Sequence, residues 1–150
     1  MTKLSKNIGL IVTCVLLCGV ICFLSGCKGD VSFSTASLSE ATICISVDQI
    51  TGKPVEKGDV FTSETAEIYC SVKLSSAPEE TQVLAQWIYI KGEVEGVTDH
   101  KIDETSLNTD GTKYLWYSIT RPDTGFPKGE YACKIFLNAK EKFSVPFTVQ

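Results

Sequence analysis

The sequence has few of the residues on which enzymes most often rely. It contains one histidine, His100, and no G-x-S-x-G, H-E-x-x-H or P-loop motif. A catalytic base needs a nucleophile and an orienting group within reach, and the acid beside His100 in the polar stretch "TDHKID" is adjacent in sequence, where side chains rarely face each other. We therefore interpret His100 as an exposed loop residue and expect no catalytic residue in the chain.

The spacing that metal sites require is also missing. Beyond residue 27 the cysteines are Cys44, Cys70 and Cys133, and no two of them, nor any of them and His100, are two to four residues apart as zinc ligands usually are. The acids of residues 99–110 do not follow the pattern of a calcium-binding loop, and we interpret them as part of a solvated loop. The sequence predicts no metal and no cofactor.

Positive charge is scarce after residue 26. Of the 14 Lys and Arg residues, only Lys3 and Lys6 come earlier, which leaves 12 against 18 Asp and Glu and a net charge of −6. Nucleic acids and anionic bilayers attract clustered Lys and Arg. We expect no nucleic-acid partner.

Only one long apolar run is present, and it lies at the start of the chain. Ile8 to Leu24 is 17 residues without a charge, preceded by Lys3 and Lys6 and followed by the small residues Ser25 and Gly26. This arrangement is typical of a secretory signal peptide. A membrane span needs about 20 apolar residues, so composition alone leaves a cleaved signal and an uncleaved anchor both open.

The motif "LSGC", residues 24–27, resembles the lipobox of bacterial lipoproteins. The resemblance implies that Leu24, Ser25 and Gly26 form the cleavage motif, that residues 1–26 are removed, and that Cys27 carries the lipid. Two or three acyl chains anchor a protein stably, so the rest of the chain would face outside the cytoplasm on the cell membrane or outer envelope. The alternative is an uncleaved helix whose cysteines serve only as small apolar residues: Cys14, Cys18, Cys22 and Cys27.

A linker and one domain follow the motif. Residues 28–40, "KGDVSFSTASLSE", are rich in Ser and Thr and poor in large apolar side chains, so with Cys27 we assign 27–40 as the lipidated cysteine and a flexible tether. The remaining residues, 41–150, suit a single domain.

Apolar residues in this domain alternate with polar ones, which indicates strands. No convincing helical repeat is visible. In the first such segment Ile43, Ile45 and Val47 share one face, and Cys44 lies on the other. The six segments are 41–49, 66–74, 81–90, 112–120, 130–138 and 142–149. We predict an all-β sandwich of about seven strands.

The arrangement of Cys70, Trp87, Tyr131 and Cys133 resembles the immunoglobulin pattern. The resemblance implies an immunoglobulin-like sandwich with a Cys70–Cys133 disulfide packed on a buried Trp87, and a Tyr131 hydroxyl bonded back to the preceding connection. The alternation of apolar and polar residues agrees with this bridge, since Cys70 and Cys133 each share a strand face with apolar neighbours. Export permits the bridge, and Cys44 should point away from the core and stay free.

The remaining aromatic residues have two interpretations. They could line a groove for a glycan or peptide, or fill the space between sheets, which we favour because large aromatics dominate the buried area of small domains. Tyr89 or Tyr117 is then the best candidate for a surface aromatic. The aromatic residues weighed in these two interpretations are Trp87, Tyr89, Tyr114, Trp116 and Tyr117.

Two function classes fit these observations. The first is a non-catalytic binding or structural module, held at the envelope by lipid and contacting an envelope protein or a glycan. The second is an envelope enzyme or enzyme inhibitor that acts through loop residues outside any known motif. An exposed apolar patch would favour binding, and a deep pocket holding His100 would favour catalysis.

Overall fold

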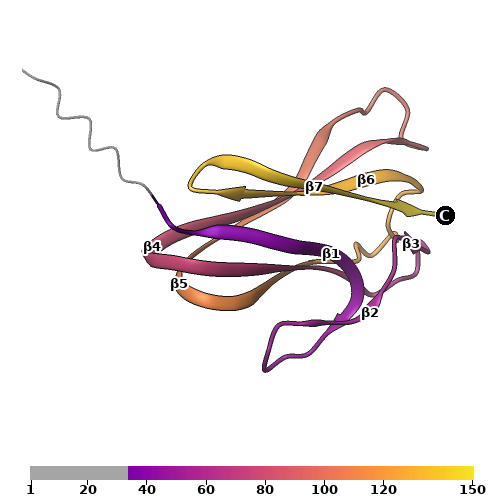
Figure 1. The fold of residues 1–150 in the computed structure, drawn as a ribbon. Coiled ribbons are helices and arrows are strands. Elements are labelled where there is room, and N and C mark those ends of the chain that lie inside the picture. The colour runs from indigo at the N-terminus through magenta and orange to yellow at the C-terminus, as the bar shows by residue number, and fades with distance from the viewer. Residues whose placement is uncertain (1–33) are drawn as a thin grey trace, which may run out of the picture. The chain divides into compact units, whose positions relative to one another are not determined.

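The computed structural model describes residues 34–150, which form strands joined by turns and loops and contain no helix (Figure 1). The predicted all-β class is confirmed. Nothing in this range forms a helix that could span a bilayer. These residues are a compact unit by themselves. The strands are β1 (Ser37–Val47), β2 (Pro54–Lys57), β3 (Val60–Phe61), β4 (Glu67–Gly92), β5 (His100–Thr120), β6 (Gly129–Leu137) and β7 (Lys140–Val149).

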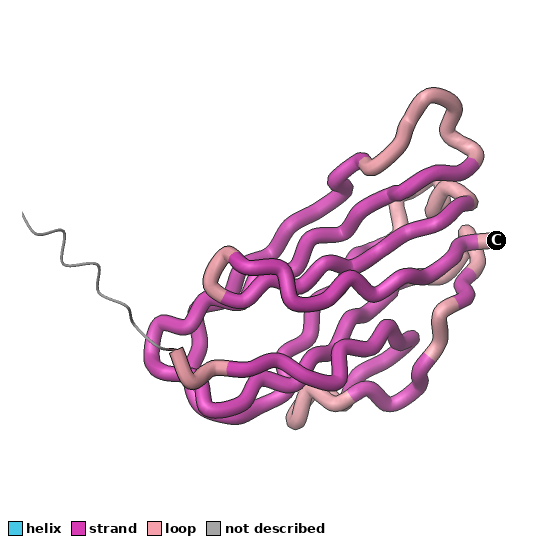
Figure 2. Tube along the Cα trace, turned by 45° about the horizontal axis from the view of Figure 1, so that its top comes forward, coloured by secondary structure: helices cyan, strands magenta, loops and turns pink. Residues whose placement is uncertain are grey.

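The seven strands form one curled, mixed sheet in the order β2-β1-β4-β6-β7-β3, with β5 paired to β4. All pairs are antiparallel except β3 and β7. We call β1, β2 and residues 67–74 and 113–120 the first half of the sheet. Residues 83–92 and 100–109 form the second half with β6 and β7. Figure 2 shows how far the long strands continue from one half to the other.

The sheet curls where the register between β4 and β5 shifts and where β4 exchanges β1 for β6 as its other neighbour. Register shifts separate the two halves of β4 between Leu74 and Thr81, where Ser76 and Glu80 have φ values of 53° and 60°. Pro78 lies between them and has no N–H to donate to a ladder. The segments 66–74 and 81–90 were predicted as separate strands, and they are the two halves of one bent strand.

The core lies between the two halves. Trp87 and Tyr131 are completely or almost completely buried, and a single apolar cluster joins residues of both halves around them. The Tyr117 hydroxyl of the first half donates to the Val83 carbonyl of the second at 2.9 Å. Each fully buried large side chain contributes about 1.5–3 kcal/mol, so the cluster holds the curled sheet closed.

The predicted stripe of Ile43, Ile45 and Val47 is wrong at its centre. Ile45 is 41% exposed, whereas Cys44 is 0% exposed. The cause is a register irregularity between Cys44 and Ser46 in the pairing with β2. Strict alternation of faces ends where a strand contains such a bulge.

Cys44 is buried even though it lies outside the main apolar cluster. It pairs with Tyr69 of β4, on the outer face of the first half. The turn after β1 covers this face, because the Ser71 hydroxyl donates to the Gly52 carbonyl at 2.8 Å. A Cβ at Gly52 would come within 2.8 Å of the Tyr114 carbonyl oxygen, so only glycine permits this approach.

The first strand begins earlier than the predicted domain. β1 starts at Ser37, which pairs with Ser75, so the last four residues of the segment assigned as a tether belong to the sheet. The segment predicted to be a signal peptide, the predicted cleavage motif and Cys27 lie outside the described residues.

The predicted solvated loop around His100 is wrong. Residues 100–109 form the first part of β5 and pair with the second half of β4, with Tyr89 opposite His100. Their side chains are exposed, since this strand has a partner along only one edge among the described strands. An exposed edge strand needs no apolar face, so the sequence of residues 100–109 does not alternate between apolar and polar residues and did not indicate a strand.

Gly92 of β4 pairs with Gly129 of β6, and the two strands lie close together at this point. A Cβ on Gly92 would lie 2.2 Å from the Lys128 carbonyl oxygen and 2.6 Å from the Tyr89 hydroxyl. We expect Gly92→Ala to lower the free energy of unfolding by about 2 kcal/mol or more, as overpacking does. Gly58→Ala, whose Cβ would meet only Ile45 at 3.9 Å, should change it by about 0.5 kcal/mol at most. Urea denaturation measures both, and equal effects would contradict the close approach.

Candidate functional site

A cleft of about 670 Å³ opens between the two ends of β5. On one side lie His100, Ile102 and Asp103 of the second half, and on the other lie residues 118–120 of the first half. Most of its lining is apolar or aromatic: Tyr89, Val94, Val97, Ile102, Ile119, Pro122, Phe126, Pro127 and Tyr131. The polar lining residues are His100, Asp103, Ser118 and Thr120.

The cleft is a consequence of the way β5 pairs. β5 follows β4 from one half to the other and has no second neighbour among the described strands. Its two ends therefore leave the space between the halves open along this side. Two buried core side chains of the second half, Tyr89 and Tyr131, are among the residues that line this opening.

Hydrogen bonds fix the two tyrosines. The Tyr131 hydroxyl donates to the Pro127 carbonyl at 2.5 Å, and the Tyr89 hydroxyl accepts from the Val94 amide at 3.1 Å. Their rings meet edge to face with centroids 5.1 Å apart. Burial is the main cause that raises the pKa of Tyr131 above its ordinary value, so its hydroxyl stays protonated. Both hydroxyls are thus held by backbone groups, while the two residues form part of the cleft lining.

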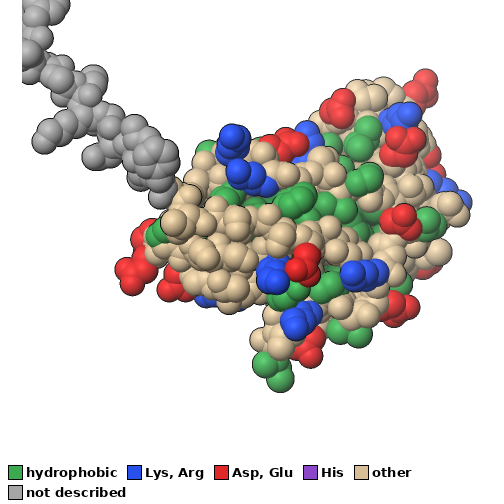
Figure 3. All heavy atoms as spheres, viewed as in Figure 1, with side chains coloured by type: hydrophobic (Ala, Val, Ile, Leu, Met, Phe, Trp, Pro, Cys, Tyr) green, Lys and Arg blue, Asp and Glu red, His purple; other side chains and the backbone are tan. Residues whose placement is uncertain are grey.

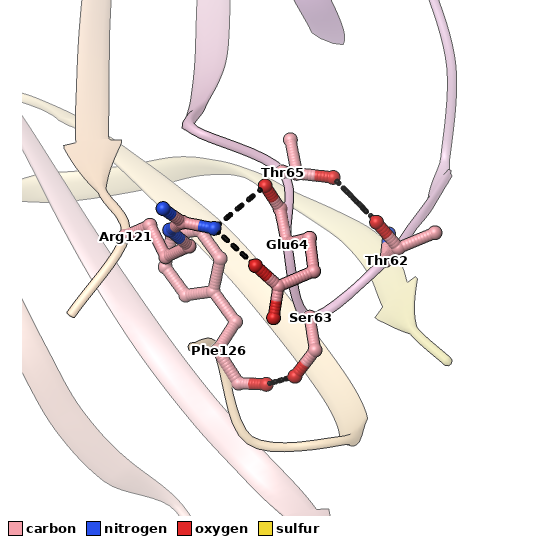
Figure 4. Close-up of polar contacts among 6 residues, drawn as sticks. All are labelled: Thr62, Ser63, Glu64, Thr65, Arg121 and Phe126. Carbon is pink, nitrogen blue, oxygen red and sulfur yellow. Dashed lines mark hydrogen bonds and ion pairs between the residues drawn. The ribbon is translucent and has the colours of Figure 1, made fainter. Parts of the chain in front are cut away.

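One wall comes from the loop between β5 and β6. The Ser63 hydroxyl donates to the Phe126 carbonyl, and the Phe126 amide donates to the Ser63 carbonyl at 3.0 Å. Arg121 donates to both the carboxylate and the carbonyl of Glu64 (Figure 4). These contacts attach the loop to the segment between β3 and β4 and hold Phe126 in place.

The other wall is the loop between β4 and β5, residues 93–99. The Lys128 amide donates to the Glu93 carboxylate at 2.8 Å, and the Glu93 amide donates to the Lys128 carbonyl at 3.0 Å. The Asp99 amide donates to the Ile90 carbonyl at 2.9 Å. This bracing places Val94 and Val97 in the lining.

His100 and Asp103 lie on the same strand at the rim. The Asp103 carboxylate accepts from the Glu104 amide at 2.8 Å. Within residues 34–150, His100 makes no side-chain hydrogen bond, so no relay of base, acid and hydroxyl is assembled in this geometry. The arrangement can hold an apolar body against aromatic rings and contact a polar group at its rim.

The other predicted site residues lie deeper in the domain. Cys70 and Cys133 are free thiols with no exposed surface, and Trp87 pairs with Cys133 across β4 and β6. Burial, together with the nearby Cys70 thiol, raises the pKa of Cys133 well above its ordinary value. Among the residues that the structure describes, the Trp87 indole N–H has no hydrogen-bond partner. Across residues 34–150 no group of three or more His, Cys, Asp or Glu is placed to hold a metal ion.

The expected surface aromatic is a different residue. Tyr89 and Tyr117 are buried, whereas Trp116 is 36% exposed on the outer face of the first half. It packs against Tyr69, with ring centroids 5.9 Å apart. Sequence reasoning also missed Phe126, Val94 and Val97, since the only signal was their position in loops that follow long strands.

The visible surface carries both signs of charge. Figure 3 shows Lys and Arg side chains interspersed with Asp and Glu side chains over one face of the domain, with hydrophobic side chains between them. That face has no extended basic surface.

No protein-family model and no curated protein matches the chain. Among solved structures, it is similar to the Pseudomonas fluorescens alkylpurine DNA glycosylase AlkC bound to DNA containing an abasic site analogue, with 16% identity, 78% of this chain and 31% of that chain covered, and a TM-score of 0.49. It is also similar to β-D-glucoside glucohydrolase from Trichoderma reesei, with 14% identity, 79% of this chain and 19% of that chain covered, and a TM-score of 0.45. The chain spans less than a third of either enzyme, and likeness at this level carries no argument about function.

Proposed function

We propose that this chain is a lipid-anchored envelope protein whose domain is a non-catalytic, immunoglobulin-like binding module. The lipobox at residues 24–27 supports the anchor. The cleft beside β5 is the binding site, and it takes a ligand with an apolar body. The observation that carries the proposal is the lining of this cleft, which is open, about 670 Å³ in volume and mostly apolar and aromatic. Binding sites for small ligands have this character.

Several features support the immunoglobulin-like interpretation of the curled sheet. The two halves enclose a core in which Cys70 and Cys133 come from opposite halves and Trp87 is fully buried. The Tyr131 hydroxyl bonds to the carbonyl of Pro127, four residues upstream, as a tyrosine corner does. In this proposal, β4 and β5 each contribute one strand to both sheets of the sandwich.

An enzyme is the second candidate function, and His100 is the observation that favours it. His100 lines the cleft together with Asp103 and Ser118. Binding accounts better for the rest of the lining, because an apolar wall recognises a ligand without requiring a reacting group. The same lining favours an apolar ligand, or an apolar side chain of an envelope protein, over a glycan.

We also propose that Cys70 and Cys133 form a disulfide after export, since both thiols are buried close together between the halves. In the loop-entropy model such a bridge is worth about 4 kcal/mol.

The cleft can be tested with a neutral apolar dye. Residues 34–150 contain the described core, so we expect the chain from residue 28 onward to fold by itself. It should bind one molecule of N-phenyl-1-naphthylamine, with a saturable rise in fluorescence. Val94→Glu places a charge in the lining and should weaken binding at least about tenfold, since it removes apolar contact and adds a desolvation cost.

Val55→Glu is the matched control, because Val55 is 67% exposed on β2 and does not line the cleft. It should leave dye binding unchanged. Equal binding by both variants, or no saturable binding by the unsubstituted chain, would contradict the proposed site.

The disulfide proposal predicts one linked pair and one free thiol. Peptide mapping without reduction of exported protein should give a Cys70–Cys133 peptide. Burial raises the pKa of Cys44 to about 11, so at pH 8 very little of it is thiolate, and it should resist alkylation until the protein is unfolded. A peptide joining Cys44 to another cysteine would contradict this pairing.

The anchor proposal predicts the effect of Cys27→Ser in the full chain. The variant should incorporate no labelled fatty acid, because serine has no thiol to receive the diacylglycerol. Cys14→Ser, within the apolar run, is the control and should be labelled as the natural chain is. Labelling of the Cys27→Ser protein would exclude Cys27 as the lipidated residue.

A further inference from the structure

From the charges around the cleft we infer that its ligand is an organic cation: an ammonium group attached to an apolar body. This inference rests on the proposed binding function and names the chemical class that the site selects. Three observations carry it: the carboxylate of Asp103 lies in the lining, acids outnumber unpaired bases around the rim, and the lining includes three aromatic residues.

Asp103 is the only acidic lining residue, and neither Lys nor Arg lines the cleft. Its carboxylate accepts one hydrogen bond, from the Glu104 amide at 2.8 Å, and no described cation lies within ion-pair distance of it. The carboxylate therefore retains acceptor capacity for a ligand. A ligand N–H donor or cation placed there would form a charge-assisted contact.

Two bases next to lining residues in the sequence are directed to other acids. Lys101 forms an ion pair with Glu104 at 3.0 Å, and Arg121 forms one with Glu64 (Figure 4). The loop that makes the second wall, residues 93–99, contains three acids and no base. Lys128, next to the lining residue Pro127, has no ion pair among residues 34–150, but the three acids of this loop and Asp103 outnumber it, which favours a cation over an anion.

The aromatic floor acts in the same direction. Tyr89, Tyr131 and Phe126 line the cleft, and the hydroxyls of both tyrosines are engaged with backbone groups. Aromatic faces attract ammonium groups through the negative charge of their π surface, while their carbon atoms contact the apolar part of the same ligand. A carboxylate at the rim of a cleft whose lining includes aromatic rings is a combination suited to an organic ammonium ion.

Three probes with one apolar body and different charges test this inference. The chain from residue 28 onward is titrated with 4-phenylbutylamine, 4-phenylbutanol and 4-phenylbutyrate, and the dissociation constants are measured from the amide chemical shifts of Val97 and Thr120. We expect the amine to bind about five- to tenfold more tightly than the alcohol, given the usual strength of one exposed ion pair and one cation–π contact, and the carboxylate to bind most weakly.

Asp103→Asn should remove the preference for the amine without changing binding of the alcohol. Asp110→Asn is the matched control: it removes another carboxylate of β5, which pairs with Lys113 and does not line the cleft, and should keep the preference. Both side chains lie on the exposed part of β5, and an unchanged unfolding midpoint verifies the fold.

The outcomes separate the inference from the proposed function. Equal or tighter binding of the alcohol, a preference that survives Asp103→Asn, or failure of all three probes while the naphthylamine dye still binds would overturn the cation inference alone. Failure of both the dye and the probes would overturn the proposed function itself.

Discussion

The structure depends on the double pairing of β4. This strand bonds to β5 along one edge over almost its whole length, and along the other edge first to β1 and then to β6. Because its two ends lie in different halves, the sheet must curl, and the apolar faces of both halves then enclose one core. If β4 ended at the bend, the two halves would no longer share a strand. The backbone of β4 therefore changes direction near Pro78 while its pairing with β5 continues on both sides of the bend.

The cleft follows from the same constraint. β5 accompanies β4 around the bend and has no outer neighbour among the described strands, so the space between the halves stays open beside it. The tyrosines that close the core at this end, Tyr89 and Tyr131, also form the floor of the cleft. Residues that stabilise the domain are therefore the ones that a ligand would contact. The two walls are loops braced by hydrogen bonds to Ser63 and Lys128.

Alternation in the sequence was sufficient to predict the all-β class and most of the strands. It worked where a strand has one buried face, as at Ile68, Cys70 and Val72. It failed where that condition does not hold. Residues 100–109 are exposed on an edge and show no alternation, and the bulge after Cys44 exchanges the faces of Ile45 and its neighbours. Alternation also cannot tell which face of an aromatic strand is inner, and so Trp116 and Tyr117 were exchanged.

The cleft itself could not be predicted from the sequence, because its lining comes from two loops and two strand ends that only the curl brings together. The most direct test of the account is an isotope-filtered NOE spectrum of the domain, labelled at Ile and Val methyl groups, with bound N-phenyl-1-naphthylamine. The account predicts contacts from one dye molecule to both Ile102 of the second half and Ile119 of the first. Contacts restricted to exposed methyl groups such as those of Val55 and Val60 would contradict it.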